Sequence, residues 1–466
     1  MSFIVYDLIF LLVFTLLAVW FLYTRRHNLK RQGLLYLYHT QWGVKLIDRV
    51  SKEYAWLLRP LQYVIVTSGY ILMAVMVWMA VKLTYIYTTS SLLVQAVKIP
   101  PIIPLVPYLP ELFKVDYLPP LYFTYWIVVI AIIAVSHEFA HGIFARLNNI
   151  KVKSTGFGFL GPFLAAFVEP DEKQMSKAPK FAQLSILGAG TFANVIMTIL
   201  FGLILWVFFI HSFAAAGVQF NSYATAPLAV SSIVTIAGMT PNDFLANNIT
   251  NNSLQEVVAL NGTYLAPGTS LKTALKKDTL QILVYDDAPA VRANLRGPII
   301  SVDNIPTRNL EELSAAIKTH LPGDNITLIV GEGKVKQVVH ITLAQRDGKT
   351  YLGIGVIKPS HGPLTSWIYN FVESIKDPLI YYEPTWGGDF TWFVYYLLWW
   401  IVLINLSVAL MNMLPVGIFD GGRFFYLTVW GVTKDEKFAR RVFSFMTWLF
   451  IAMAAWLMVR WAIAFI

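Results

Sequence analysis

Six long apolar runs divide this chain of 466 residues, and each is long enough to cross a membrane. They cover residues 3–23, 61–87, 121–147, 181–209, 391–414 and 442–466. A helix that crosses the hydrocarbon of a bilayer needs roughly 20 apolar residues. The mean hydropathy of +0.58 also exceeds that of an average soluble chain. We therefore expect a polytopic α-helical membrane protein with about six spans.

Clusters of Lys and Arg indicate how these spans are oriented. The clusters lie beside the apolar runs, at residues 25–31, 146–153 and 434–441. Cytoplasmic loops are rich in Lys and Arg, so we expect an outside N-terminus and a first run that is a span rather than a secretory signal. The net charge of +9 raises the possibility of nucleic acid binding. Because the cations are topology signals of a multi-pass cell-membrane protein, no nucleic acid partner is expected.

Four shorter segments between the spans have different patterns. Residues 34–59 mix aromatic and basic side chains, which favours an interfacial segment on the cytoplasmic surface. Seven prolines between residues 100 and 120 predict an irregular outside loop. The glycine-rich segment 154–168 is too short for a span and predicts a re-entrant β-hairpin. Residues 368–383 are expected to approach the membrane as an amphipathic segment.

Residues 214–363 change to short alternating runs separated by Asn, Asp, Gly and Pro. This pattern is typical of a strand-rich soluble insertion, which we place outside the cytoplasm. Residues 287–345 resemble a PDZ domain, with a possible second, degenerate copy at 226–286. The expected domains are thus 1–120, 121–213, 214–363 and 364–466. Four Asn-Xaa-Ser/Thr sequences agree with an outside location, each only weakly: Asn248, Asn251, Asn261 and Asn325.

The third apolar run contains the sequence His137-Glu138-Phe139-Ala140-His141. Positions i and i+4 of a helix share one face, so both imidazoles can bind one zinc ion. Glu138 is then placed to deprotonate a zinc water. The alternative is a pair of histidines that only pack between helices. A charged Glu inside a membrane is costly without a partner or a wet cavity, so the functional interpretation is favoured.

A zinc site needs a third protein ligand, and the chain has no cysteine to supply it. Four side chains are candidates: Glu169, Asp171, His211 and Asp420. By the expected topology His211 lies at the opposite end of its span from the histidine pair, and the first two suit a solvated hairpin exit. Asp420 follows the fifth span at matching depth, after Pro and Gly residues that can turn the chain back toward the site.

The HExxH sequence, together with Asn412-x-x-Pro-x-x-x-x-Asp420-Gly in a later span, resembles the site-2 protease family of intramembrane metalloproteases. The resemblance implies one zinc ion held by His137, His141 and Asp420. It implies Glu138 as the catalytic base. The family's Gly-x-x-x-Asn element matches the segment from Gly190 to Asn194, and its re-entrant hairpin agrees with 154–168.

The resemblance also implies substrates and partners. These are single-span membrane proteins in the bilayer, cut within their transmembrane segments by regulated intramembrane proteolysis after another protease has trimmed them. PDZ-like modules of the family are thought to screen such chains. Asn412 and Asn194 suit contacts to the substrate backbone or the oxyanion, or hydrogen bonds between spans. Gly158, in the glycine-rich hairpin, is a candidate for strand pairing with an unwound substrate.

Two other function classes remain to be weighed against a protease. A metal transporter predicts acidic or His residues along successive spans, and the first, second and sixth runs supply almost none. An inactive scaffold would use only the PDZ-like module to hold clients. The presence of all three expected ligands together with Glu138 argues against a scaffold.

Overall fold

The computed structural model describes residues 3–33, 35–89, 100–102, 104–112, 118–160, 163–247, 253–277, 279–333, 335–356, 370, 373 and 375–463. It forms two compact units. The membrane unit comprises Met1–Leu205 and Trp392–Ile466, and the inserted unit is Trp206–Thr391. Two of the Asn-Xaa-Ser/Thr sequences, at Asn248 and Asn251, lie outside the described residues.

Six helices among the described residues are long and apolar enough to span a membrane, as expected. They are α1 (Phe3–Thr24), α3 (Ala55–Thr89), α6 (Phe123–Leu147), α8 (Lys180–Ser212), α14 (Asp389–Asn412) and α16 (Glu436–Ile463). The expected starts of α3 and α16 were six residues late. Basic residues in the first turns, Arg59 in α3 and Lys437, Arg440 and Arg441 in α16, lower the hydropathy there although the helix has begun. The end of α14 precedes Pro415, consistent with the restriction that proline places on the residues before it.

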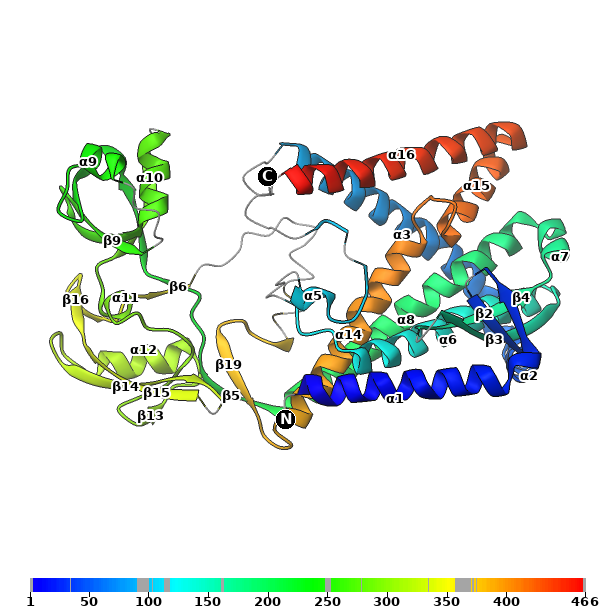
Figure 1. Ribbon diagram of the computed structural model, residues 1–466, viewed down its shortest axis with the longest axis horizontal. Helices are drawn as coiled ribbons and strands as arrows, with labels where there is room; N and C mark the ends of the chain where they lie inside the picture. The colour runs from blue at the N-terminus through cyan, green and yellow to red at the C-terminus, as the bar shows by residue number, and fades with distance from the viewer. Residues whose placement is uncertain are drawn as a thin grey trace. The chain divides into compact units, whose positions relative to one another are not determined.

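Shorter helices connect the spans: α2 (Trp42–Glu53), α5 (Leu109–Leu112), α7 (Glu172–Lys177), α15 (Asp420–Thr433) and the 3-10 turn η1 (Arg26–Asn28). Helix α16 packs against α15 and α3 (Figure 1). The main core of the membrane unit joins α2, α3, α6, α8 and α15 around buried residues such as Ile47, Ile65, Ile186 and Phe424. This core surrounds the cytoplasmic half expected for α6 and thereby fixes the helix that carries HExxH.

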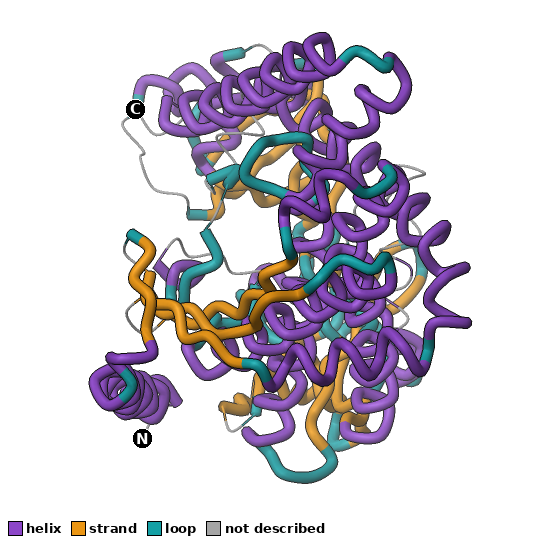
Figure 2. Tube along the Cα trace, turned by 90° about the vertical axis from the view of Figure 1, so that its right-hand side faces the viewer, coloured by secondary structure: helices purple, strands orange, loops and turns teal. Residues whose placement is uncertain are grey.

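A four-stranded antiparallel sheet belongs to the same unit. Its strands follow the order β1 (Leu29–Gln32), β2 (Leu35–Thr40), β3 (Val152–Leu160) and β4 (Phe163–Pro170). Figure 2 shows these strands beside the helix that carries the N-terminus. The expected hairpin is therefore the β3–β4 pair, and the segment expected to be only interfacial contributes β2 and α2. Since β3 pairs on both sides, β4 is the edge strand nearest α6.

The inserted unit is strand-rich, as expected. Its first sheet has the order β7-β11-β10-β9-β8 and packs its core with Ile236, Phe244, Val257 and Leu271. The elements are β7 (Thr225–Ala229), η2 (Val230–Ser232), β8 (Ile233–Ile236), α9 (Pro241–Ala246), β9 (Leu254–Ala259), β10 (Gly262–Pro267), α10 (Gly268–Lys276) and β11 (Gln281–Asp286). Neighbouring strands are antiparallel throughout.

The second sheet of this unit has the order β15-β14-β12-β5-β19, with β13 paired to β12. The elements are β5 (Phe213–Val218), α11 (Pro289–Arg292), β12 (Ile299–Val302), β13 (Ile305–Pro306), α12 (Leu310–Lys318), β14 (Asn325–Glu332), β15 (Val335–Thr342) and β19 (Ile380–Pro384). Two ribbons pair β6 (Ser222–Tyr223) with β18 (Ile354–Gly355), and β16 (Ala344–Arg346) with β17 (Lys349–Tyr351). The segment expected to approach the membrane at 368–383 thus ends in a strand, and five of its other twelve residues lie outside the described residues.

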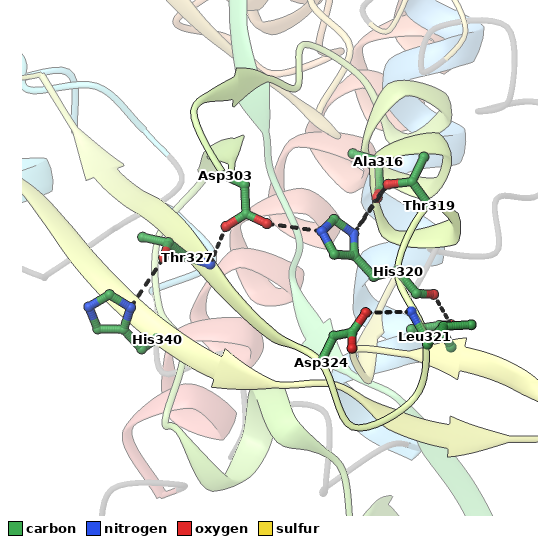
Figure 3. Close-up of polar contacts among 9 residues, drawn as sticks. Asp303, Ala316, Thr319, His320, Leu321, Asp324, Thr327 and His340 are labelled. Carbon is green, nitrogen blue, oxygen red and sulfur yellow. Dashed lines mark hydrogen bonds and ion pairs between the residues drawn. The ribbon is translucent and has the colours of Figure 1, made fainter.

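Polar side chains fix the helix of the second sheet at both ends. Asn309 caps α12 by accepting the backbone N–H of Glu312 at 2.8 Å, which is the local signal that begins the helix. At the other end His320 contacts Asp303 through Nε2 and the carbonyl of Ala316 through Nδ1, each at 3.0 Å (Figure 3). This network ties the end of α12 to the turn that follows β12.

Candidate zinc site

The two histidines of the HExxH sequence lie on one face of α6, as their spacing predicts. His137 Nε2 and His141 Nε2 are 3.0 Å apart, and the two rings meet edge to face. Both side chains are largely buried in the membrane unit. One turn of helix therefore brings two potential metal ligands together without help from any other element.

Asp420 completes the group from a distant part of the sequence. It is the first residue of α15, and its Oδ2 lies 3.3 Å from Nε2 of both His137 and His141. The turn between α14 and α15 is tight, since a Cβ on Gly421 would collide with the backbone of Met413. Asp420 thus supplies the ligand, and glycine is the only residue type that fits at position 421.

The donor set fits a zinc ion. One ligand atom from each of the three side chains lies within 4.8 Å of the other two. A tetrahedron with bonds of 2.0–2.1 Å has edges of about 3.3 Å, which matches the observed separations. Room for the ion exists because residue 190 is glycine: a Cβ there would lie 2.6 Å from His137 Nε2 and closer still to His141 Nε2. Three protein ligands leave a fourth position open, as in catalytic zinc sites.

Each histidine uses its second nitrogen for a hydrogen bond that sets its orientation. His141 Nδ1 lies 2.7 Å from the carbonyl oxygen of Ile186, to which it donates when Nε2 binds metal. His137 Nδ1 lies 3.0 Å from the side-chain amide of Asn194. With metal on Nε2, Nδ1 carries the hydrogen, so the Asn194 carbonyl oxygen is the matching acceptor. Without a hydrogen bond from His137 Nδ1, the Asn194 carbonyl oxygen is buried and has no partner among the described residues.

This geometry gives Asn194 a more specific role than the two expected from sequence. The residue has no solvent exposure and lies behind His137, on the side of the ring away from the other ligands. This place suits a hydrogen bond that positions His137. The Gly190–Asn194 spacing of four places both residues on the face of α8 that meets the zinc site.

Glu138 points toward the edge strand of the sheet. Its Oε2 accepts the backbone N–H of Val168 in β4 at 3.1 Å, which holds the carboxylate beside the histidine pair. Glu138 also lines the cavity that contains the three ligands. Its position agrees with the expected base, next to the ligands but not among them.

A cavity of about 820 Å³ surrounds the site. Its wall is mostly apolar, with Asn412 and Arg423 as additional polar residues beside the ligands. Asn412 thus lies where contact with a substrate is feasible, whereas Gly158 does not line this cavity. Arg423 was not singled out from the sequence, although its position three residues after Asp420 places it on the same side of α15.

The other candidates for the third ligand have different partners. Glu169 accepts a hydrogen bond from Ser154 Oγ at 2.8 Å and lies 3.9 Å from His39. Asp171 caps α7, and the backbone N–H of Gln174, helped by nearby Lys153, lowers the pKa of its carboxyl group. Neither belongs to the metal-binding group. His211 bonds to the carbonyl of Val207 in its own helix.

Residues of the N-terminal region contact α6 at both ends. At one end Asp7 of α1, 1% exposed, accepts the backbone N–H groups of Phe123 and Thr124 at 2.8 Å each. At the other end Arg146 donates two hydrogen bonds to the carboxylate of Asp48 in α2. The helix that carries HExxH is thus positioned by segments far from it in sequence.

The proline-rich segment forms part of the cavity wall through Leu105 and Val106. Trp126 Nε1 donates to the carbonyl of Leu105 at 2.8 Å, and the hydroxyl of Tyr108 donates to Asp7. Burial, followed by the hydrogen bond to Asp7, raises the pKa of Tyr108, so its hydroxyl stays a donor. The segment expected as an outside loop therefore reaches the candidate site.

Comparison with known proteins agrees with this site. The family model of peptidase family M50 matches residues 125–455. A protein of Nostoc sp. named "Putative zinc metalloprotease all3971" is 23% identical over 341 residues, which is 66% of this chain and 85% of that protein. A protein of Methanocaldococcus jannaschii named "Uncharacterized protein MJ0971" is 45% identical over 76 residues, 16% of this chain and 20% of that protein. The chain therefore belongs to peptidase family M50, the site-2 protease family, as an integral multi-pass membrane protein with a zinc site.

Proposed function

We propose that this protein is an intramembrane zinc metalloendopeptidase that cuts the transmembrane segments of membrane-anchored proteins. The observation that carries the proposal is Glu138 beside the group of His137, His141 and Asp420, in one cavity among the spanning helices. An ionisable group at this place needs a wet cavity, and hydrolysis needs water at the same place.

The residues of the chain divide the chemistry between them. Zinc, when bound, supplies Lewis-acid activation of a water molecule and of the substrate carbonyl. Glu138 takes a proton from the attacking water and later gives one to the leaving amine. The N–H of Val168 orients the Glu138 carboxylate for both transfers. Asn412 and Arg423, on the same cavity wall, supply donors for the developing oxyanion.

A membrane-spanning helix must unwind before its peptide bonds can be attacked, and an edge strand can hold it unwound. The expected edge near Gly158 is not free, because Gly158 pairs with Leu37 on one side and Ala165 on the other. In our proposal the free edge of β4 pairs with the unwound substrate. The N–H of Val168 points away from β3, so the N–H of Ala166, two residues earlier, points the same way.

The strand-pairing step has its own test. Ala166→Pro removes an N–H at the free edge without removing one from the β3–β4 ladder. Cleavage of helical substrates should then fall while zinc content stays the same. Equal cleavage by the variant and the wild type would rule out pairing at this edge.

The inserted unit supports a screening role. It holds two separate antiparallel sheets, each with its own core and covering helix, which agrees with two PDZ-like copies. PDZ domains add an extended peptide to a sheet edge, so this unit would admit chains whose outside part has already been trimmed. In the topology given by the basic clusters, the unit lies outside and the zinc site faces the cytoplasm.

The deciding experiment compares cleavage of a panel of single-span membrane proteins by the wild type, Glu138→Gln and Glu53→Gln, with zinc quantified in each. Glu53 is exposed on α2 and serves as the matched control. We expect cleavage by the wild type and by Glu53→Gln, and none by Glu138→Gln despite bound zinc. Cleavage by Glu138→Gln would overturn the role of the base. No cleavage by any form with zinc bound would favour the inactive scaffold.

A further inference from the structure

A second cavity, of about 920 Å³, lies against the four-stranded sheet of the membrane unit. Its lining is rich in cations drawn from two parts of the sequence: Lys30, Arg31, Lys153 and Lys173. Only two carboxylates, Glu169 and Glu172, line it as well. The cavity is therefore positively charged, and none of the zinc ligands belongs to it.

Most of these cations are not neutralised by the protein itself. Lys153 pairs with Asp171 at 3.7 Å. Lys30, Arg31 and Lys173 form no ion pair within the part of the chain that the structure describes. Glu169 is engaged with Ser154 and His39, whose Nε2 is buried without a partner among the described residues. Three uncompensated cations favour an anionic ligand.

The cavity shares one wall with the zinc site. Four residues line both cavities, and all belong to β4: Ala165, Ala166, Val168 and Pro170. Proline has no N–H, so strand pairing along this edge ends at Pro170. The basic cavity and the zinc cavity thus lie on a common wall along β4 up to Pro170.

We propose that the basic cavity binds an acidic segment of the substrate that flanks the cleaved bond. This inference rests on the proposed function, and it adds a charge requirement to the substrate class. The Asp or Glu side chains then lie on the side of the cut bond that continues along β4. The wall shared with the zinc site favours a continuous peptide over an anionic lipid headgroup as the ligand.

The experiment uses the full chain in vesicles of neutral lipid and a substrate that the wild type cleaves. One substrate keeps its acidic flank, a second has neutral residues there and a third has Lys. Each is tested with the wild type, with Lys30→Glu/Lys173→Glu, and with Lys45→Glu, a single charge reversal at an exposed position of α2, as the control. Binding of each substrate to the Glu138→Gln form is measured by cross-linking, so that the cavity is tested even without turnover.

We expect the neutral flank to raise KM about tenfold at low salt with little change in kcat, and the double variant to prefer the Lys flank. High salt should reduce both effects, since the charges are partly exposed. Indifference of the wild type to flank charge, or an equal response in Lys45→Glu, would overturn the inference. A second contradicting result is that cleavage by the wild type depends on anionic lipid and that the double variant loses this dependence with every substrate. The cavity would then be a lipid site. Failure of the proposed function gives a different result, namely no cleavage of any substrate. Cross-linking then still shows whether the basic cavity binds the acidic flank.

Discussion

Gly190 faces His137 so closely that a Cβ at residue 190 would lie 2.6 Å from Nε2, the nitrogen that faces His141 and Asp420 in the candidate zinc site. The absence of a side chain on α8 thus creates the space for the metal. We expect Gly190→Ala to remain folded, to lose zinc and to cut substrate about a hundredfold more slowly, since small displacements of reacting groups have effects of that size. Zinc content and cleavage rate are the measurements.

Gly202→Ala is the matched control, because it lies on the same helix and a Cβ there meets nothing within 4 Å. It should bind zinc and cut substrate like the wild type. Equal zinc content in the two variants would contradict this account of residue 190.

Asn194 should affect zinc binding through His137. Removal of its amide in Asn194→Ala takes away the acceptor for Nδ1, and outer-shell partners of this kind contribute about 10- to 100-fold in metal affinity. Asn194→Asp keeps an acceptor and should bind zinc much more tightly than the alanine variant. The measurement is competition for zinc with a chelator of known affinity.

Asn405→Ala controls for the loss of a buried amide as such. Asn405 is equally buried, but it donates to the carbonyl of Ile401 within α14. Its replacement should leave zinc affinity unchanged. If Asn194→Ala and Asn405→Ala weaken zinc binding to the same extent, the effect belongs to helix packing and not to His137.

Asp7 should stabilise the membrane unit, because it caps the helix of the zinc ligands from another span. Asp7→Ala leaves the backbone N–H groups of Phe123 and Thr124 without their acceptor, which should cost about 2 to 4 kcal/mol. Asp7→Asn keeps one acceptor oxygen and should fall between this variant and the wild type. Thermal unfolding in detergent measures the difference.

Thr24→Ala, at the other end of α1, is the control for that comparison. Thr24 is exposed, and its hydrogen bonds to the described residues go only to carbonyls of its own helix. It should unfold at the wild-type temperature. A similar loss of stability in Asp7→Ala and Thr24→Ala would show that the cap contributes nothing specific.

The sequence predicted what depends on local spacing, and it missed what depends on distant partners. The spans follow from runs of apolar residues, and the histidine pair follows from the pitch of one helix. The sequence placed a free sheet edge near Gly158. It could not show that β2 pairs with β3 there, because β2 lies more than a hundred residues earlier in the chain. Likewise, a lone Asp7 in an apolar run indicates a partner but does not name Phe123.

Trp126 connects the start of α6 with the cavity wall and provides the last prediction. Trp126→Phe keeps an aromatic ring but removes the N–H that bonds to the carbonyl of Leu105, at a cost of about 1 kcal/mol. Because Leu105 and Val106 line the cavity, a less firmly held wall should change KM for bulky substrates more than kcat. Steady-state cleavage of substrates that differ in side-chain size near the cut measures this. Zinc content should stay the same, since the bond from Trp126 to Leu105 involves none of the zinc ligands. A fall in zinc content with unchanged KM would contradict the assignment of Leu105 and Val106 to the substrate side of the site.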